Sequence, residues 1–196
     1  MDTARAIKAR VWEREEHDHY VEPEWVSRRL FEEERFVGSV WDPACGFGRI
    51  PEAALAAGLH ITFSDIVDRG YLSLGVPTVV GDFLTATPAI EADNIVSNPP
   101  FNIADQFALH ALKLARTKVA MVFPTARLNA AHWLKGTPLY RVWLLTPRPS
   151  MPPGHVIAAG GKPGGGKMDY CWLVWLQGYE GQPSVRWMRK NAEVVG

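Results

Sequence analysis

The stretch Val40–Ile50, VWDPACGFGRI, joins a short apolar run to a glycine-rich turn and then to a helix-forming segment. The run 39–41 predicts a buried strand, and the alanine-rich segment 51–57, closed by Gly58, predicts a helix. Glycines in such a turn let the backbone approach a ligand, and the helix N-terminus offers free amides. The turn lacks the third small residue of G-x-G-x-x-G, which argues against NAD or FAD.

The rest of the chain continues this alternation of strands and helices. Short apolar runs predict further strands at 60–64, 78–80, 94–97, 119–123, 141–145, 170–176 and 184–188. Helices are expected from Glu22-Pro23-Glu24 onward and over 104–116. Strands that alternate with helices predict an α/β fold with a mostly parallel central sheet of about seven strands and helices on both faces.

Length and composition predict one domain of 196 residues, with 47% hydrophobic and 21% charged residues. We divide it into an N-terminal arm and helix (1–37), a core with the glycine turn (38–123) and a substrate-side half with a glycine-rich loop (124–196). The sequence has no apolar run long enough to span a bilayer, and its N-terminus is too polar for a secretory signal. With only Cys45 and Cys171, we expect a cytoplasmic protein with reduced thiols.

Three acidic residues follow three of the predicted strands. Asp42 ends the first strand, Asp65 the second and Asp82 the third. Asp65 lies about twenty residues after the glycine turn, the separation at which an acid reaches ribose hydroxyls. Asp82 is placed to accept a hydrogen bond from an adenine amino group, with Phe83 beside the ring. Taken singly, each acid is equally well explained as a helix cap or a turn residue.

The fourth strand ends in IVSNPPF, residues 95–101. Prolines 99 and 100 fix the backbone and remove amide donors, so that polar oxygens are directed outward. The Asn98 side-chain oxygen and the Pro99 carbonyl can both accept hydrogen bonds from one amino group, which concentrates the nitrogen lone pair for attack on a methyl group. Phe101 is expected to stack on an extrahelical base. The alternative is a rigid turn after a strand.

These motifs and their order resemble class I (Rossmann-like) S-adenosylmethionine-dependent methyltransferases, in particular the amino-methylating group that includes adenine-N6 DNA methyltransferases. Tyr20-Val21-Glu22-Pro23 resembles this family's additional cofactor motif, but carries Glu22 where the family usually has Thr. The resemblance implies S-adenosylmethionine as cofactor. The cofactor-binding residues that it implies are Tyr20, Asp42, Ala44, Gly46, Gly48, Asp65, Ile66, Asp82, Phe83 and Asn98.

The resemblance also implies methyl transfer to the exocyclic amino group of adenine in DNA, with Asn98, Pro99, Pro100 and Phe101 as catalytic residues. Related enzymes with the same motif modify RNA bases or protein glutamine, and a non-catalytic cofactor-binding subunit of a modification complex is a further alternative. DNA-specific members usually carry a target recognition domain. Because only the segment 146–167 is left for recognition here, we expect relaxed specificity or help from a second subunit or a homodimer.

The charge distribution favours a nucleic-acid partner. From Lys113 to the C-terminus the chain has 12 Lys and Arg against 3 Asp and Glu, whereas residues 1–112 have 9 against 18. Such an asymmetry can give an otherwise neutral protein a positive face. Arg148, Lys162 and Lys167 in the glycine-rich loop are the expected phosphate contacts. Solvated surface charge and a plain disordered loop are the alternatives.

Two other patterns predict no function. The segment Gly161–Lys167 matches G-x-x-x-x-G-K, but Met168 replaces the magnesium-binding Ser or Thr, and a strand follows where a helix should. His17-Asp18-His19 lacks the spacing of a metal site, so we expect no bound metal. Cys45 is interpreted as a small filler residue and not as a nucleophile.

Overall fold

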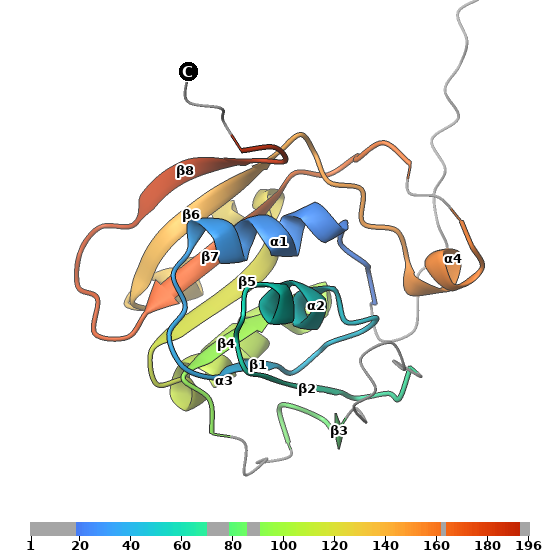
Figure 1. The fold of residues 1–196 in the computed structure, drawn as a ribbon. Coiled ribbons are helices and arrows are strands. Elements are labelled where there is room, and N and C mark those ends of the chain that lie inside the picture. The colour runs from blue at the N-terminus through green and yellow to red at the C-terminus, as the bar shows by residue number, and fades with distance from the viewer. Residues whose placement is uncertain (1–18, 70–78, 86–90, 162–163, 193–196) are drawn as a thin grey trace, which may run out of the picture.

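The computed structural model describes residues 19–69, 79–85, 91–161 and 164–192. Their eight strands form one sheet of order β3-β2-β1-β4-β5-β7-β6-β8 (Figure 1). The strands are β1 (Val40–Asp42), β2 (Ile61–Asp65), β3 (Val79–Val80), β4 (Asn94–Ser97), β5 (Lys118–Pro124), β6 (Leu139–Thr146), β7 (Tyr170–Leu176) and β8 (Ser184–Arg189). Each predicted strand is present, with its ends within two residues of the prediction.

The carboxyl ends of all these strands except β7 lie at one edge of the sheet. Only β7 runs antiparallel to its neighbours β5 and β6; all other pairs are parallel. From β1 the chain proceeds outward through β2 and β3, then returns to β4 on the other side of β1. The carboxyl ends of β1 and β4 therefore flank the point where the strand order reverses, which is where open α/β sheets bind ligands.

Helices cover both faces of the sheet, as predicted. Helices α1 (Glu24–Glu33) and α2 (Arg49–Ala56) lie on one face and α3 (Ala104–Leu114) on the other (Figure 1). Central strands are buried on both sides: in β7, Trp172 packs in the core under α1, whereas Trp175 packs in the core on the α3 side. The described residues also form three 3-10 helices: η2 (Phe101–Ile103), η3 (Thr125–Ala130) and η4 (His132–Leu134).

A short helix, α4 (Gly154–Ala158), lies within the Gly/Pro-rich stretch 147–166, where the sequence predicts only a loop. Residues on either side of its start pair with the segment that precedes α1. The Val21 amide donates to the Pro152 carbonyl at 2.9 Å, and the Gly154 amide donates to the His19 carbonyl at 3.0 Å. The segment 152–154 is thereby attached to the segment 19–21.

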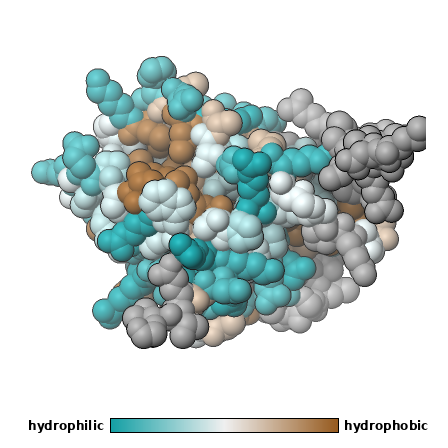
Figure 2. Space-filling view, turned by 90° about the horizontal axis from the view of Figure 1, so that it is seen from above, coloured by the Kyte–Doolittle hydropathy of each residue, from teal (hydrophilic) through white to brown (hydrophobic). Residues whose placement is uncertain are grey.

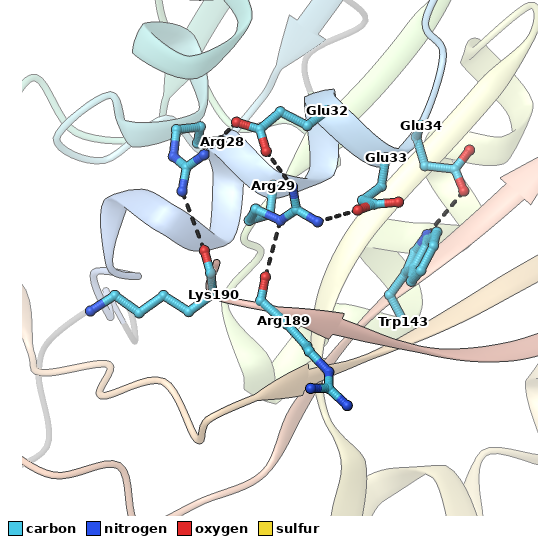
Figure 3. A network of polar contacts seen from close by, with 8 residues as sticks. All are labelled: Arg28, Arg29, Glu32, Glu33, Glu34, Trp143, Arg189 and Lys190. Carbon is cyan, nitrogen blue, oxygen red and sulfur yellow. Dashed lines mark hydrogen bonds and ion pairs between the residues drawn. The ribbon is translucent and has the colours of Figure 1, made fainter. Parts of the chain in front are cut away.

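Polar contacts attach α1 to the far end of the sheet (Figure 3). Arg29 Nε donates to the Arg189 carbonyl at the end of β8 at 3.0 Å, and its guanidinium also pairs with Glu32 and Glu33. Just after the helix, Glu34 Oε1 accepts from Trp143 Nε1 of β6 at 2.9 Å. These contacts fix the position of α1 over β6 and β8.

The edge strand β8 exposes part of its apolar surface. Met188 is buried against the α1 side, whereas Val185 and Trp187 are 55% and 65% exposed. Seen from above, the molecule shows a group of hydrophobic atoms among mostly hydrophilic ones (Figure 2). Within the described residues, no helix combines the length and the apolar character needed to cross a membrane.

Candidate functional site

Two adjoining cavities lie at the carboxyl ends of β1, β2 and β4. The larger encloses about 520 Å³ of space, including the open solvent at its mouth. It is lined by His19, Tyr20, Pro43, Ala44, Asp65, Ile66, Arg69, Gly81, Asp82, Phe83, Asn98, Pro100, Ile103 and Phe107. The smaller, of about 270 Å³, is lined by His19–Glu22, Asp42, Ala44–Phe47, Arg49, Ile50 and Asn98. Both cavities share His19, Tyr20, Ala44 and Asn98, so the NPPF corner and the glycine turn face a common space.

The Asn98 side chain is held in one orientation at this junction. Its Nδ2 donates to the Tyr20 carbonyl and to Glu22 Oε2, both at 2.8 Å. Because the Tyr20 carbonyl can only accept a hydrogen bond, the nitrogen must face it and the oxygen must face away. Asn98 Oδ1 is buried and has no hydrogen-bond partner among the described residues. A buried acceptor without a partner costs free energy unless a ligand supplies a donor.

Glu22, which holds Asn98, is itself buried, with 6% of its surface exposed. Its second oxygen, Oε1, accepts from Ser27 Oγ of α1 at 3.0 Å. None of the ion pairs among the described residues includes Glu22. Burial raises the pKa of this carboxyl above its ordinary value, and the hydrogen bonds and the charge of Arg49 oppose that rise.

Asp42 connects the end of β1 to the end of β4. Its Oδ1 accepts from Ser97 Oγ at 2.9 Å and from the Ala44 amide at 3.2 Å. The side chain is almost fully buried, and burial raises its pKa well above the ordinary value; the nearby Glu22 and Asp65 carboxylates raise it further. Asp42 thus fixes the start of the glycine turn under the smaller cavity.

Asp65 connects the glycine turn to the loop after β2. Its Oδ2 accepts from the Gly46 amide at 2.8 Å, Oδ1 accepts from the Val67 amide at 3.1 Å, and Arg69 lies at ion-pair distance, 3.6 Å. Gly46 has a φ of +51°, and a Cβ there would lie 2.5 Å from His19 Nε2. Only glycine fits this position without a shift of His19.

The loop after β3 completes the larger cavity. Asp82 accepts from the Leu84 amide at 2.9 Å and from Thr85 Oγ1 at 3.0 Å. Phe83 is buried against Trp41 and Phe107, with ring centroids 5.1 and 4.4 Å apart. The structure therefore brings Asp82 and Phe83 to the same cavity as Asp65, together with the exposed Ile66.

Of the NPPF residues, Asn98 and Pro100 line a cavity, whereas Pro99 and Phe101 are buried. Phe101 is 8% exposed, and its ring lies between Tyr20, stacked at 5.9 Å, and Tyr170 at 5.6 Å. An incoming base can stack on Phe101 only if one of these ring contacts opens. Its expected stacking role therefore stays a prediction.

Two of the expected phosphate contacts, Arg148 and Lys167, are not among the residues that line the two cavities. Arg148 forms a two-pronged pair with Asp169, at 2.6 and 3.1 Å, so its charge is already compensated. Lys167 is exposed just before β7, and Lys162 lies outside the described residues. Gly48, predicted in the turn, has a φ of +79° and directly precedes α2.

Several polar residues that line the two cavities were not predicted from the sequence, among them Arg49 and Glu22. Arg49 lines the smaller cavity, and its buried Nε has no hydrogen-bond partner among the described residues. Glu22 was noted only as a departure from the usual motif, yet it holds Asn98.

Among the described residues no cluster of three His, Cys, Asp or Glu side chains is arranged for a metal, and His17 and Asp18 lie outside them. Burial raises the pKa of the Cys45 thiol, which keeps it neutral.

Comparisons with known proteins bear on the fold. No protein-family model matches the sequence, and no curated protein matches it. Among solved structures, the type I restriction-modification methyltransferase subunit from Streptococcus thermophilus superposes with a TM-score of 0.59 at 13% identity, covering 85% of this chain and 46% of that one. The M protein of the type I restriction enzyme EcoKI gives 0.60 at 14% identity, covering 91% and 50%.

A protein from Pyrococcus horikoshii, predicted to be an RNA methyltransferase, gives a TM-score of 0.54 at 16% identity, covering 78% of this chain and 81% of that one. This chain spans about half of the length of the two type I subunits. At these identities the likeness shows the fold alone. The chain therefore has the mixed α/β, Rossmann-like fold of S-adenosylmethionine-dependent methyltransferases.

Proposed function

We propose that this chain is an S-adenosylmethionine-dependent methyltransferase that modifies the exocyclic amino group of adenine in DNA. The observation that carries the proposal is the Asn98 amide: its nitrogen is bound on both sides, and its buried oxygen has no partner at the junction of the two cavities. Such an oxygen is suited to accept a hydrogen bond from an amino group.

The residues of the two cavities fit the proposed cofactor. The larger cavity offers apolar walls at Ile66, Phe83 and Phe107 and carboxylates at Asp65 and Asp82, which suits a nucleoside. The smaller cavity offers the Asp42 carboxylate for a cationic group and the Arg49 Nε for a carboxylate, which suits the amino-acid end. When bound, S-adenosylmethionine supplies an activated methyl group on a positively charged sulfur.

The proposed work of the protein is to orient and activate the amine. The lone pair of an exocyclic amino group is delocalised into the ring, so this nitrogen is a poor nucleophile. A hydrogen bond from the amine to Asn98 Oδ1, and a second to the Pro99 carbonyl, concentrates the lone pair on nitrogen. S-adenosylmethionine, held by the residues of the two cavities, would supply the methyl group: a nitrogen–carbon bond would replace its sulfur–carbon bond, S-adenosylhomocysteine would leave, and the amine would release one proton. Catalysis rests on positioning and on pre-oriented dipoles.

The choice of nucleic acid rests on charge and on the NPPF motif. The basic half of the sequence begins at Lys113 and contains the strands that extend the sheet beyond β5. Two of the similar structures are described as type I restriction-modification subunits, and another is predicted to be an RNA methyltransferase. These observations favour a nucleic acid over a protein amide; adenine and DNA follow from the motif resemblance.

Transfer of tritiated methyl groups to DNA, RNA and protein tests the proposal. We expect label in DNA, recovered as N6-methyladenine after digestion to nucleosides. Asn98→Ala should lower kcat by about a hundredfold or more while cofactor affinity, measured by calorimetry, stays within about twofold. Asn102→Ala, an exposed neighbour, is the matched control and should retain activity. Label only in RNA or protein, or an active Asn98→Ala variant, contradicts the proposal.

A further inference from the structure

We infer that Glu22 is a positioning residue that fixes and polarises the Asn98 amide, making Asn98 Oδ1 a stronger hydrogen-bond acceptor for the substrate amine. The inference rests on the proposed role of Asn98. Glu22 itself contacts no reacting atom: it acts through Asn98 Nδ2, to which its Oε2 lies at 2.8 Å.

The contacts of Glu22 hold its carboxylate in one place. One oxygen faces Asn98, the other accepts from Ser27 Oγ at 3.0 Å, and Ser27 is fully buried in α1. Helix α1 is in turn attached to β6 and β8 through Glu34 and Arg29. Since both carboxylate oxygens are engaged and the side chain is buried, Glu22 cannot turn away from Asn98 without breaking these bonds.

The charge of Glu22 acts on the far end of the Asn98 amide. An ionised acceptor forms a stronger hydrogen bond than a neutral one, and hydrogen bonds in a chain polarise one another. Electron density drawn from the N–H bonds moves through the conjugated amide toward Oδ1. The second N–H of the Asn98 side chain donates to the Tyr20 carbonyl. Neither N–H of this amide is therefore left to bond with water.

A merely structural role for Glu22 needs a hydrogen-bond acceptor but no charge. Glu22→Gln separates the two roles, because the glutamine oxygen can still accept from Asn98 Nδ2 while its amide faces the Ser27 hydroxyl, which can accept. If position and not charge were sufficient, this variant would be nearly as active as the wild type.

The charged and titratable groups around Glu22 define how its ionisation depends on pH. Arg49 of α2 favours the ionised carboxylate, and Asp42 of β1 disfavours it. His19 lines the same cavity from the segment before Glu22. Because burial is the largest influence and raises the pKa of Glu22, the carboxylate gains its charge at a higher pH than an exposed glutamate.

The kinetic test compares Glu22→Gln with Glu24→Gln, the same change at an exposed position two residues away. We expect kcat of Glu22→Gln to fall about ten- to a hundredfold. This fold-change corresponds to the free energy of an ordinary charge-assisted hydrogen bond. KM for both substrates should stay within about twofold. The wild-type kcat should decline at acidic pH as Glu22 is protonated, and this decline should be absent from Glu22→Gln. A rise in the cofactor KM, or an unchanged kcat, overturns the inference.

A second measurement needs no catalytic activity, so it separates failure of this inference from failure of the proposed function. In nitrogen-15 spectra of the ligand-free protein, the Asn98 side-chain amide signal is assigned by its loss in Asn98→Ala. We expect this signal to shift with pH as Glu22 titrates, in the wild type and in Glu24→Gln, and to stay constant in Glu22→Gln. A signal that does not respond to Glu22 overturns the inference even if the protein methylates DNA. A responding signal in a protein without methyltransferase activity contradicts the proposed function instead.

Discussion

At the residue scale, Asp65 is an example of one side chain that shapes a site and remains able to bind. Each of its oxygens accepts one backbone hydrogen bond, from Gly46 or from Val67, and a carboxylate oxygen can accept a second. Asp65 also lines the larger cavity. It can therefore hold the glycine turn in place and still accept hydrogen bonds from the hydroxyls of a nucleoside.

We expect Asp65→Asn to weaken binding of S-adenosylhomocysteine by about tenfold or more. The asparagine amide keeps only one acceptor oxygen, so either the Gly46 amide or the Val67 amide loses its partner. Calorimetry on the purified protein measures the affinity, and Asp68→Asn, an exposed residue on the same loop, is the control. Equal affinities of the wild type and Asp65→Asn would show that Asp65 neither shapes nor contacts the cofactor site.

The buried carboxyls Glu22 and Asp42 predict a dependence of stability on pH. Burial raises the pKa of both groups in the folded protein, so the folded state binds their protons more tightly than the unfolded state. Their contribution to stability is therefore complete below the ordinary values of 4.5 and 3.8, and is lost as the pH rises through the raised values.

Urea denaturation of the ligand-free wild type and of Glu22→Gln checks this sign. As the pH rises from about 4 to about 8, the wild type should lose free energy of unfolding relative to the variant, because only the wild type must ionise a buried carboxyl at position 22. The loss of stability with rising pH is larger in the wild type also because the Glu22 charge raises the pKa of Asp42. A difference in stability that is constant over this range contradicts the prediction.

At the element scale, the central strands were predictable because they are apolar runs that the sheet buries, as in β4 and β5. Helix α4 was not, because it has only five residues, begins with Gly154, and takes its position from pairing with His19 and Val21. The same limit applies to the site. Asn98 and Asp65 were identifiable because they follow strands, whereas the contact of Glu22 with Asn98 spans 76 residues and leaves no local pattern.

Glu34, between α1 and β1, joins three elements and predicts a large effect on stability. Its carboxylate is buried and accepts from Lys118 Nζ at 2.9 Å, Arg141 Nη1 at 2.7 Å and Trp143 Nε1 at 2.9 Å. Glu34→Ala leaves two largely buried cations without their partner, which we expect to lower the free energy of unfolding by about 3–5 kcal/mol.

Chemical denaturation measures this loss, with Glu91→Ala as the control. Glu91 also pairs with an arginine, Arg116, but on the surface, and exposed pairs contribute little. A similar small change in both variants would show that Glu34 does not hold the elements together.

At the scale of the whole molecule, strand direction determines which lysines of the basic half lie at the same edge of the sheet as the site. Because β7 runs antiparallel to β5, the residues just before it, including Lys167, lie at the same edge of the sheet as Asn98. Helix α3 runs from that edge back to the start of β5, so the exposed Lys113 near its end lies at the opposite edge. Lys167 and Lys113 therefore carry the same charge at opposite ends of the strands.

A nucleic acid that reaches Asn98 should contact Lys167 and not Lys113. We expect Lys167→Glu to weaken DNA binding and to lower the slope of log affinity against log salt by about one phosphate contact, whereas Lys113→Glu should change neither. Fluorescence anisotropy with a labelled duplex at several salt concentrations measures both quantities. An equal loss in the two variants would mean that DNA responds to the net charge of the protein, and that its binding is not directed to the edge where the NPPF corner lies.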